Sequence, residues 1–241
     1  MARLRYPTGV RPLLIDETAR RRRVEARVVT LLEASGFAEV VLPVIDYAEP
    51  YAAAGGADPR QAYRFIDRDG ELVAIRSDFT PLVARALAPS LAEAELPLRV
   101  FYRGDVIRYE PSRLGANREM FQIGAEIIGD AGVESDIAVL RLVSRMLREL
   151  GIEPLIVYGD ERAPSVVPER LEAIAAAAIP GCVPHLDDEP TGRYYTGLRF
   201  RAYDASRRVV IAQGGRYDSL YERFGCAAPA VGFTITVDEV R

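Results

Sequence analysis

The stretch LRVFYRGDVIRYEPSRLGANREMFQIGAEIIG, residues 98–129, decides the fold. β-branched and aromatic residues fill both of its ends, whereas proline, glycine and charged residues fill its centre, so it predicts two strands joined by a polar loop over 110–118. Side chains two and four residues apart share one face of a strand, which places Arg118, Gln122 and Glu126 together. Such a polar face belongs either to an exposed antiparallel hairpin or to the floor of a polar binding site, and the pattern leaves both open.

The composition narrows the chemistry that the protein can perform. All 31 basic residues of the 241-residue chain are arginines. Without lysine there is no Schiff-base chemistry and no Walker-type phosphate lysine, and any bound anion would meet planar guanidinium groups. The formal net charge of -4 gives no basic footprint for nucleic acid.

Histidine and cysteine are scarce. The single histidine, His185, lies in a segment typical of a surface loop, and the two cysteines are Cys182 and Cys226. These residues cannot supply an ordinary zinc site or a Ser-His-Asp triad with a spare, so we expect no bound metal. Two separated cysteines, no secretion signal and no apolar run of membrane-spanning length are typical of a reduced, cytoplasmic protein without a membrane segment.

Apolar periodicity and turn residues predict the elements on either side of the hairpin. The predicted helices occupy residues 16–35, 77–88, 133–150, 169–178 and 214–224. The other predicted strands occupy residues 37–45, 63–66, 71–76, 155–158, 194–200, 209–213 and 230–237. Asp16 is expected to cap the first helix, and Ser77 or Asp78 the second. Asp78 and Thr80 at that second helix start are either a cap or ligands for a cationic or amine group.

Five segments, in this order, resemble the catalytic core of class II aminoacyl-tRNA synthetases, and of histidyl-tRNA synthetase in particular. FAEVVLPVIDYAEPY (37–51) resembles the first class II motif, which forms a dimer interface. FYRGDVIRYE with GANREMFQIGAEIIG (101–110 and 115–129) resembles the second. YYTGLRF (194–200) and QGGRYDSL (213–220) resemble two histidine-recognition segments, and PAVGFTITVDEV (229–240) resembles the third motif.

The resemblance implies an α+β architecture, a class II synthetase-like core with a mainly antiparallel sheet flanked by helices. It covers the chain except for residues 160–190, which hold a short Ala-rich helix and an acidic loop. We therefore expect one synthetase-like core domain over 1–241, with a short helical insertion at 160–190 and no anticodon-binding domain. A homodimer through the first-motif region is also implied.

The resemblance further implies a histidine-binding pocket, carried over residue by residue. Its expected members are Asp78, Thr80, Gln122, Glu126, Tyr195 and Tyr217. Gln122 and Glu126 match residues that hold the amine and imidazole of the substrate, and Asp78 stands where the synthetases have the longer glutamate. The chemistry agrees, because a zwitterion with an imidazole ring needs carboxylates, an amide and aromatic hydroxyl groups.

The adenylation half of the synthetase pattern is eroded. Arg108, Glu110 and Arg118 are expected remnants of the nucleotide site. Four expected side chains are replaced, three arginines and an adenine-stacking aromatic; the residues in their places are Glu239, Pro190, Ala116 and Met120. Adenylyl transfer depends on fixed positive charge against the phosphates, so we expect adenylation to be lost, with no catalytic residue and no cofactor.

A histidine pocket without adenylation resembles the synthetase-like regulatory subunits of ATP phosphoribosyltransferase. These accompany the short-form catalytic subunit in the first step of histidine biosynthesis, which implies a hetero-oligomer that is activated by this chain and inhibited by L-histidine, without tRNA. A divergent amino-acid-adenylating enzyme, a ligand-free interaction module with a synthetase fold, and a truncated synthetase remain alternatives. The sequence does not locate the surface that meets the catalytic subunit.

Overall fold

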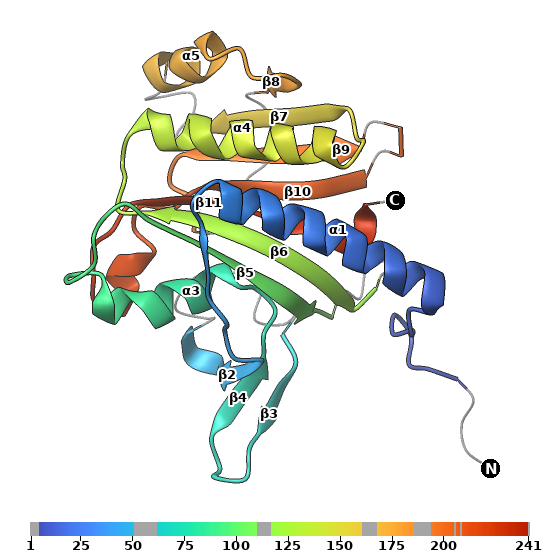
Figure 1. Cartoon of the computed structure of the whole chain (residues 1–241). Coiled ribbons are helices and arrows are strands. Elements are labelled where there is room, and N and C mark those ends of the chain that lie inside the picture. Colours follow the sequence, from blue (N-terminus) through green and yellow to red (C-terminus); the bar gives the residue numbers. More distant parts are fainter. Residues whose placement is uncertain are drawn as a thin grey trace.

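An eight-stranded sheet runs through the centre of the protein in the computed structural model (Figure 1). The structure describes residues 5–50, 62–109, 117–160, 168–185, 194–204, 206–207 and 209–240. The strands, in spatial order, are β1 (Ala38–Glu39), β5 (Leu98–Ile107), β6 (Glu119–Ile128), β11 (Ala230–Thr236), β10 (Val209–Arg216), β9 (Leu198–Asp204), β7 (Pro154–Asp160) and β8 (Cys182–Pro184). Only the outermost pairs, β1 with β5 and β7 with β8, are parallel. The prediction of a mainly antiparallel sheet is confirmed.

The central hairpin is formed by β5 and β6, ten residues each, as the sequence predicts. Its register places Tyr102 opposite Gly124 and Val100 opposite Glu126. Side chains alternate between the two faces, so Phe101 and Ile123 enter one hydrophobic core while Tyr102 and Val106 enter another. The hairpin therefore separates two cores. The loop residues 110–116 lie outside the described part of the chain.

Two long helices cover one face of the sheet (Figure 1). They are α1 (Ile15–Ala34) and α4 (Val133–Glu149), which contact each other and the central strands. Val28 and Leu32 of α1 are fully buried, as are Leu140 and Leu147 of α4. Apolar residues three and four positions apart lie on one side of each helix and form its buried stripe. Each buried side chain contributes about 1.5–3 kcal/mol to the free energy of folding. The shorter α5 (Pro168–Ala176) packs against α4.

The opposite face carries α3 (Thr80–Leu87) and the 3₁₀ turns η1 (Ala88–Ser90) and η2 (Tyr221–Phe224). Leu82 and Val83 of α3 pack with Tyr102 and Leu220 in the second core. Beside it lies a separate three-stranded sheet in the order β2 (Ile45–Tyr47), β4 (Leu72–Ile75), β3 (Arg64–Ile66). Its antiparallel β3–β4 hairpin confirms the strands predicted over 63–66 and 71–76. No helix in the described residues is long and apolar enough to cross a membrane.

The structure corrects five local predictions. Leu14, not Asp16, is the N-cap of α1, and Phe79, not Ser77 or Asp78, is the N-cap of α3. The expected strand over 37–45 shortens to β1 because the chain leaves the sheet before Pro43. The strand expected over 194–200 begins only at Leu198.

The fifth correction concerns residues 214–224, where a helix was expected. Gly214 and Gly215 instead continue β10, which ends at Arg216, and only η2 is helical. A side chain at Gly214 would place its Cβ 2.2 Å from the carbonyl oxygen of Gly232 on β11. These glycines therefore allow close strand pairing. In the sequence alone, the same two glycines look like the loop before a helix.

Candidate functional site

The buried carboxylate of Glu126 is the centre of the candidate site. It projects from β6 toward α3 and is 1% exposed. Its Oε1 accepts hydrogen bonds from the hydroxyls of Tyr102 at 3.0 Å and Thr80 at 3.2 Å, and its Oε2 accepts one from the hydroxyl of Tyr217. Four elements of the fold thus converge on one acid: β5, β6, the start of α3 and the turn after β10.

Burial sets the charge of this acid. Desolvation raises the pKa of Glu126 from 4.5 to about 8, although the hydrogen bonds from Tyr102 and Thr80 oppose the rise. The nearby carboxylate of Asp78 raises it further. Near neutral pH the Glu126 carboxyl therefore keeps its proton much of the time, and a cationic group placed beside it would drive that proton off.

Asp78 forms the second acidic group of the site. Desolvation raises its pKa, while the charge of Arg108 lowers it. Its Oδ1 accepts a hydrogen bond from the Thr80 backbone N–H at 3.2 Å, and its Oδ2 accepts one from the Tyr194 hydroxyl at 3.3 Å. Asp78 is not the N-cap of α3, but its carboxylate bonds the helix start and also faces the pocket.

Three tyrosine rings form the aromatic wall. Tyr194 meets Tyr217 edge to face, with ring centroids 5.7 Å apart, and Tyr195 lies 5.0 Å from Tyr194. Sequence reasoning named Tyr195 and Tyr217 but missed Tyr194 and Tyr102. Tyr194 is the first residue of the same YYTG segment, and Tyr102 shares a strand face with Arg108 by the alternation of side chains, so both signals were present.

Two glycines make room for the buried acid. Gly232 of β11 pairs with Glu126, and a Cβ at Gly232 would lie 1.4 Å from Glu126 Oε2. A Cβ at Gly124 would lie 2.3 Å from the Tyr102 hydroxyl oxygen. The carboxylate and the phenol occupy the space that these two positions leave free, so the site depends on glycine at both.

The cavity above these groups is small, about 30 Å³. Its lining residues are Asp78, Thr80, Arg108, Gln122, Tyr194, Tyr195, Gln213, Gly214, Tyr217, Gly232, Phe233 and Thr234. The structure thus brings together every expected pocket residue, with Glu126 bonded to Thr80 and Tyr217 of the lining. Gln213 and Thr234 are additional members. Because one water molecule needs about 10–15 Å³ of such space, the cavity has room for a few waters, and a whole amino acid would enter only if side chains or backbone move.

Two of the expected nucleotide-site remnants are neighbours across the hairpin, where the Arg108 backbone N–H donates to the Arg118 carbonyl oxygen at 2.9 Å, but their side chains have different partners. Arg108 lines the small cavity and donates a hydrogen bond to the Ser77 carbonyl oxygen at 2.5 Å. Arg118 instead donates to the Tyr63 hydroxyl at 2.9 Å and lies over the Tyr109 ring. Glu110 lies outside the described residues, as do Ala116 and Pro190. Met120 packs against the second core.

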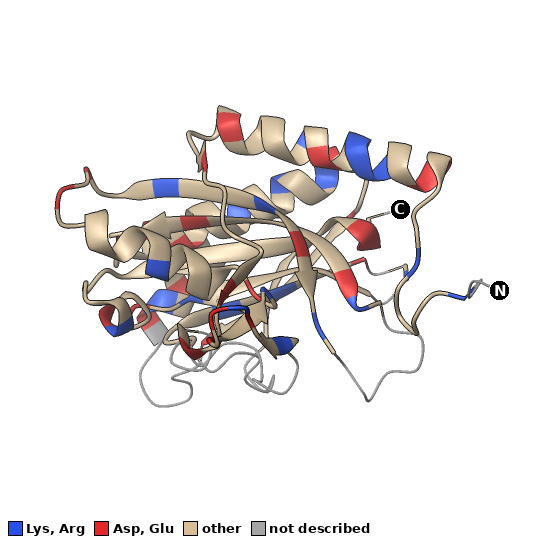
Figure 2. Ribbon diagram, turned by 90° about the horizontal axis from the view of Figure 1, so that it is seen from below, with Lys and Arg blue, Asp and Glu red and all other residues tan. Residues whose placement is uncertain are grey.

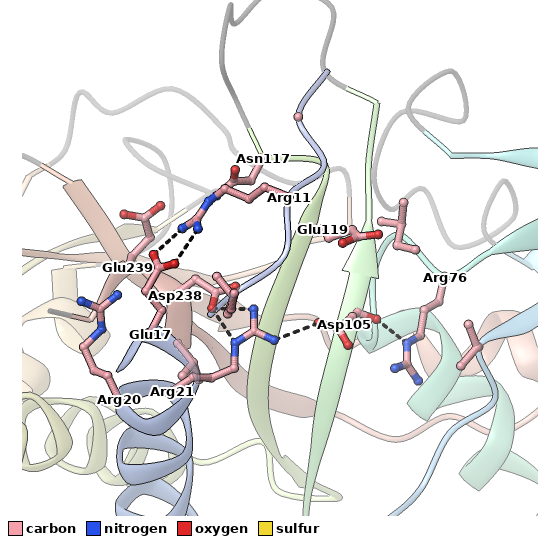
Figure 3. Close-up of a pocket in the computed structure, with 15 residues that line it drawn as sticks. Arg11, Glu17, Arg20, Arg21, Arg76, Asp105, Asn117, Glu119, Asp238 and Glu239 are labelled. Atoms are coloured by element: carbon pink, nitrogen blue, oxygen red, sulfur yellow. Dashed lines mark hydrogen bonds and ion pairs between the residues drawn. The ribbon is translucent and has the colours of Figure 1, made fainter. Parts of the chain in front are cut away.

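Glu239 borders a different and larger cavity, of about 440 Å³, on the α1 face (Figure 3). There the start of α1 meets the ends of β5 and β6 and the 3₁₀ turn η3 (Val237–Glu239). Charges of both signs line it and largely neutralise each other: Arg21 pairs with Asp238 at 2.8 Å, and Arg11 pairs with Glu17 at 2.7 Å. None of the expected histidine-binding residues lines this cavity.

Comparison with known proteins agrees with this geometry. The family model described as histidyl-tRNA synthetase matches residues 9–159 and 169–240, and the chain belongs to the histidyl-tRNA synthetase family. Within that family, the chain is similar to proteins named ATP phosphoribosyltransferase regulatory subunit. That of Moorella thermoacetica is 28% identical over 98% of this chain and 81% of the relative. That of Symbiobacterium thermophilum is 29% identical over 100% of this chain and 80% of the relative.

Solved structures confirm the fold. An ATP phosphoribosyltransferase regulatory subunit/histidyl-tRNA synthetase from Bacillus halodurans superposes with a TM-score of 0.85 at 21% identity, covering 98% of this chain and 82% of that one. Apo histidyl-tRNA synthetase from S. aureus gives 0.83 at 20% identity, covering 99% and 69%. The class II synthetase-like α+β fold predicted from the five segments is confirmed.

Proposed function

We propose that the protein is a non-catalytic regulatory subunit of ATP phosphoribosyltransferase, which binds the short-form catalytic subunit in the cytoplasm, activates it, and transmits inhibition by L-histidine. The names of the curated relatives support the regulatory role. The observation that carries the histidine part is the convergence of Asp78 and Glu126 beside Tyr195 and Tyr217, in a chain of the histidyl-tRNA synthetase family.

Each part of histidine finds a complementary group in this pocket. The ammonium group suits the carboxylates of Asp78 and Glu126, whose pKa values are raised by desolvation and would fall when a cation arrives. The carboxylate of the ligand suits the Arg108 guanidinium. The imidazole nitrogens suit tyrosine hydroxyls and the amide of Gln122, which makes no side-chain hydrogen bond within the described residues.

The small volume suggests how binding reaches the partner. Histidine cannot enter about 30 Å³ without displacing part of the lining. Thr80 is the first residue of α3, and Tyr217 leads into η2; these two elements contact each other in the second core. Opening of the pocket would therefore move α3 and η2, and histidine would shift the equilibrium by its higher affinity for the open form. A catalytic subunit that prefers one form would respond to it.

Exposed apolar side chains support a homodimer through the first-motif region. Val41 is 90% exposed, and Val44, Ile45 and Tyr47 are each about half exposed. Phe65 and Ile66 extend this surface on the neighbouring hairpin. Exposed apolar side chains that gather on adjoining segments are typical of protein interfaces. A second copy that covers this surface, here called the small-sheet surface, would complete the dimer within the larger hetero-oligomer.

The test is a reconstitution with the short-form catalytic subunit of the same source. We expect phosphoribosyl-ATP to form at a substantial rate only in the mixture, and the rate to fall when histidine is added. Calorimetry of the isolated protein with histidine should show binding. Absence of activation would reject the regulatory role, and absence of heat with activation intact would assign histidine to another site.

The retained Arg108 at the pocket favours one second candidate, a divergent enzyme that still adenylates an amino acid. Glu239 opposes it, because the synthetase pattern has an arginine at this position and here a carboxylate pairs with Arg207 at 3.4 Å. Histidine-dependent exchange of pyrophosphate into ATP separates the two. We expect no exchange above the background without enzyme.

A further inference from the structure

A groove on the α4 face has a chemistry that neither the histidine pocket nor the dimer surface uses. It encloses about 210 Å³ between α4, the C-terminal end of α1 and the strands beneath them. α1 and α4 contact each other on this face of the sheet (Figure 1). Arg99, Arg141 and Arg145 form its rim, and Phe37, Ile127 and Leu142 form its floor. We call it the arginine groove.

The rim carries positive charge that the described part of the chain leaves unneutralised. Arg141 and Arg145 are exposed, stand one helical turn apart, and make no hydrogen bond or ion pair with any described residue. Like charges at this spacing destabilise a helix by about 0.2–0.5 kcal/mol. Arg99 makes only a 3.3 Å hydrogen bond to the Ser35 carbonyl oxygen and stacks over Phe37. None of the described residues that line the groove is acidic.

Two of the arginines that line the larger cavity differ from those of the rim. In that cavity Arg11 and Arg21 each face a carboxylate within 2.8 Å. Acidic and basic residues are both spread over the ribbon (Figure 2). The arginine groove is therefore a place where the chain keeps charge of one sign without a counter-charge of its own.

The apolar floor of the arginine groove indicates which kind of ligand fits it best. Phe37, Ile127 and Leu142 are each less than 10% exposed and form the outer edge of the first core. A small inorganic anion would use the rim and leave the apolar floor wet. A single-stranded nucleic acid would stack its bases on exposed aromatic faces, but Phe37, the one ring among the described lining residues, is covered by Arg99. An acidic peptide with one apolar anchor uses both rim and floor.

We propose that the arginine groove is the docking site for an acidic segment, with an apolar anchor side chain, of a partner protein. The identity of that partner as the catalytic subunit of ATP phosphoribosyltransferase rests on the proposed function. The carboxylates of the segment pair with Arg141 and Arg145, and its anchor fills the groove above Leu142. Arginine suits this role because its planar fork binds carboxylates through two hydrogen bonds.

The experiment compares charge reversals on two helices of the full-length protein. Arg141→Glu and Arg145→Glu reverse the rim, while Arg23→Glu reverses an exposed arginine of α1, about 18 Å along that helix from Ser35 at 1.5 Å per residue. Binding to the catalytic subunit is measured by sedimentation and calorimetry at low and high salt. Circular dichroism and histidine calorimetry check that each variant is folded and has an intact pocket.

We expect each rim variant to bind the catalytic subunit about tenfold more weakly or worse, with the difference shrinking at high salt, and Arg23→Glu to bind as the parent does. Equal binding by all variants would overturn the docking site while leaving the regulatory role intact. No binding by the parent protein would overturn both. A rim variant that changes only the self-association of the protein would assign the groove to a second copy and overturn the proposal.

Discussion

The hydroxyl of Tyr217 donates a hydrogen bond to the carboxylate of Glu126, 91 residues earlier in the chain, and neither side chain is more than 2% exposed. The two residues meet only because β11 lies between β6 and β10. With the hydroxyls of Tyr102 and Thr80, three donors hold one buried acid. Because burial raises the pKa of this carboxyl to about 8, a cationic ligand beside it would favour loss of its proton.

Glu126→Gln should weaken histidine binding about tenfold or more, because a charged hydrogen bond to the ligand is worth about 1.5–3 kcal/mol. Calorimetry measures the affinity. The matched control is Glu119→Gln on the same strand, since Glu119 is exposed and does not line the pocket. Unchanged affinity in Glu126→Gln would remove Glu126 from the site.

The free energy of unfolding without ligand should fall as the pH rises from about 4.5 to about 8, the unfolded and folded pKa values of Glu126. The folded state holds the proton more tightly, so the contribution of Glu126 is complete below the unfolded pKa and is lost as the pH passes the folded pKa. Urea unfolding across this range measures it. Glu126→Gln should lack this part of the fall and be more stable than the parent at pH 8; a parallel decline in both would contradict the assignment.

Histidine binding at pH 7 should release protons. The arriving ammonium group favours the ionised forms of Glu126 and Asp78, whose pKa values are raised in the empty pocket. The binding enthalpy should therefore change with the ionisation enthalpy of the buffer, and less so in Glu126→Gln. An enthalpy that is the same in phosphate and Tris buffers would argue against this coupling.

Gly232→Ala should destabilise the protein by about 1–3 kcal/mol, because the added Cβ would lie 1.4 Å from Glu126 Oε2. Thermal or urea unfolding measures the loss. Adding Glu126→Ala to this variant removes the overlapping atom and should restore part of the stability, a coupling that two independent sites would not show. Gly132→Ala is the control, since its Cβ would lie 3.0 Å from a carboxylate oxygen of Asp130 and 3.9 Å from the Glu134 backbone nitrogen, without the overlap seen at Gly232.

Val41→Glu should convert the proposed homodimer to a monomer in sedimentation velocity. A charge at the 90% exposed Val41 would be buried without a partner in a dimer through the small-sheet surface. Val183→Glu, at an exposed valine on the outermost strand β8, is the control and should keep the parent's oligomeric state. Identical behaviour of both variants would place the interface elsewhere.

The sequence was sufficient wherever local pattern and tertiary packing agree. The hairpin over 98–129 and the helix over 133–150 follow from strand and helix periods, and both are confirmed. The helix predicted over 214–224 was wrong because Gly214 and Gly215 pair with β9 and β11. That pairing is set by the neighbouring strands of the sheet and not by the residues next to the glycines in sequence. The prediction of Asp16 as a cap was wrong because the helix starts one residue earlier, at Ile15.

The candidate site shows the same division. The motifs identified residues that do come together around one cavity, although they lie on segments far apart in sequence. The Tyr102 and Tyr217 hydrogen bonds to Glu126, and the small size of the cavity, depend on strand register and side-chain packing across three neighbouring strands. No spacing rule within a single segment contains that information.

The closed state of the pocket has a consequence for the speed of sensing. If histidine enters only when this small cavity opens, the observed association rate would level off at the rate of opening as the ligand concentration rises. Stopped-flow mixing would detect this plateau. A gate of this kind averages over rapid fluctuations, so the protein would follow the sustained supply of the amino acid and ignore brief pulses.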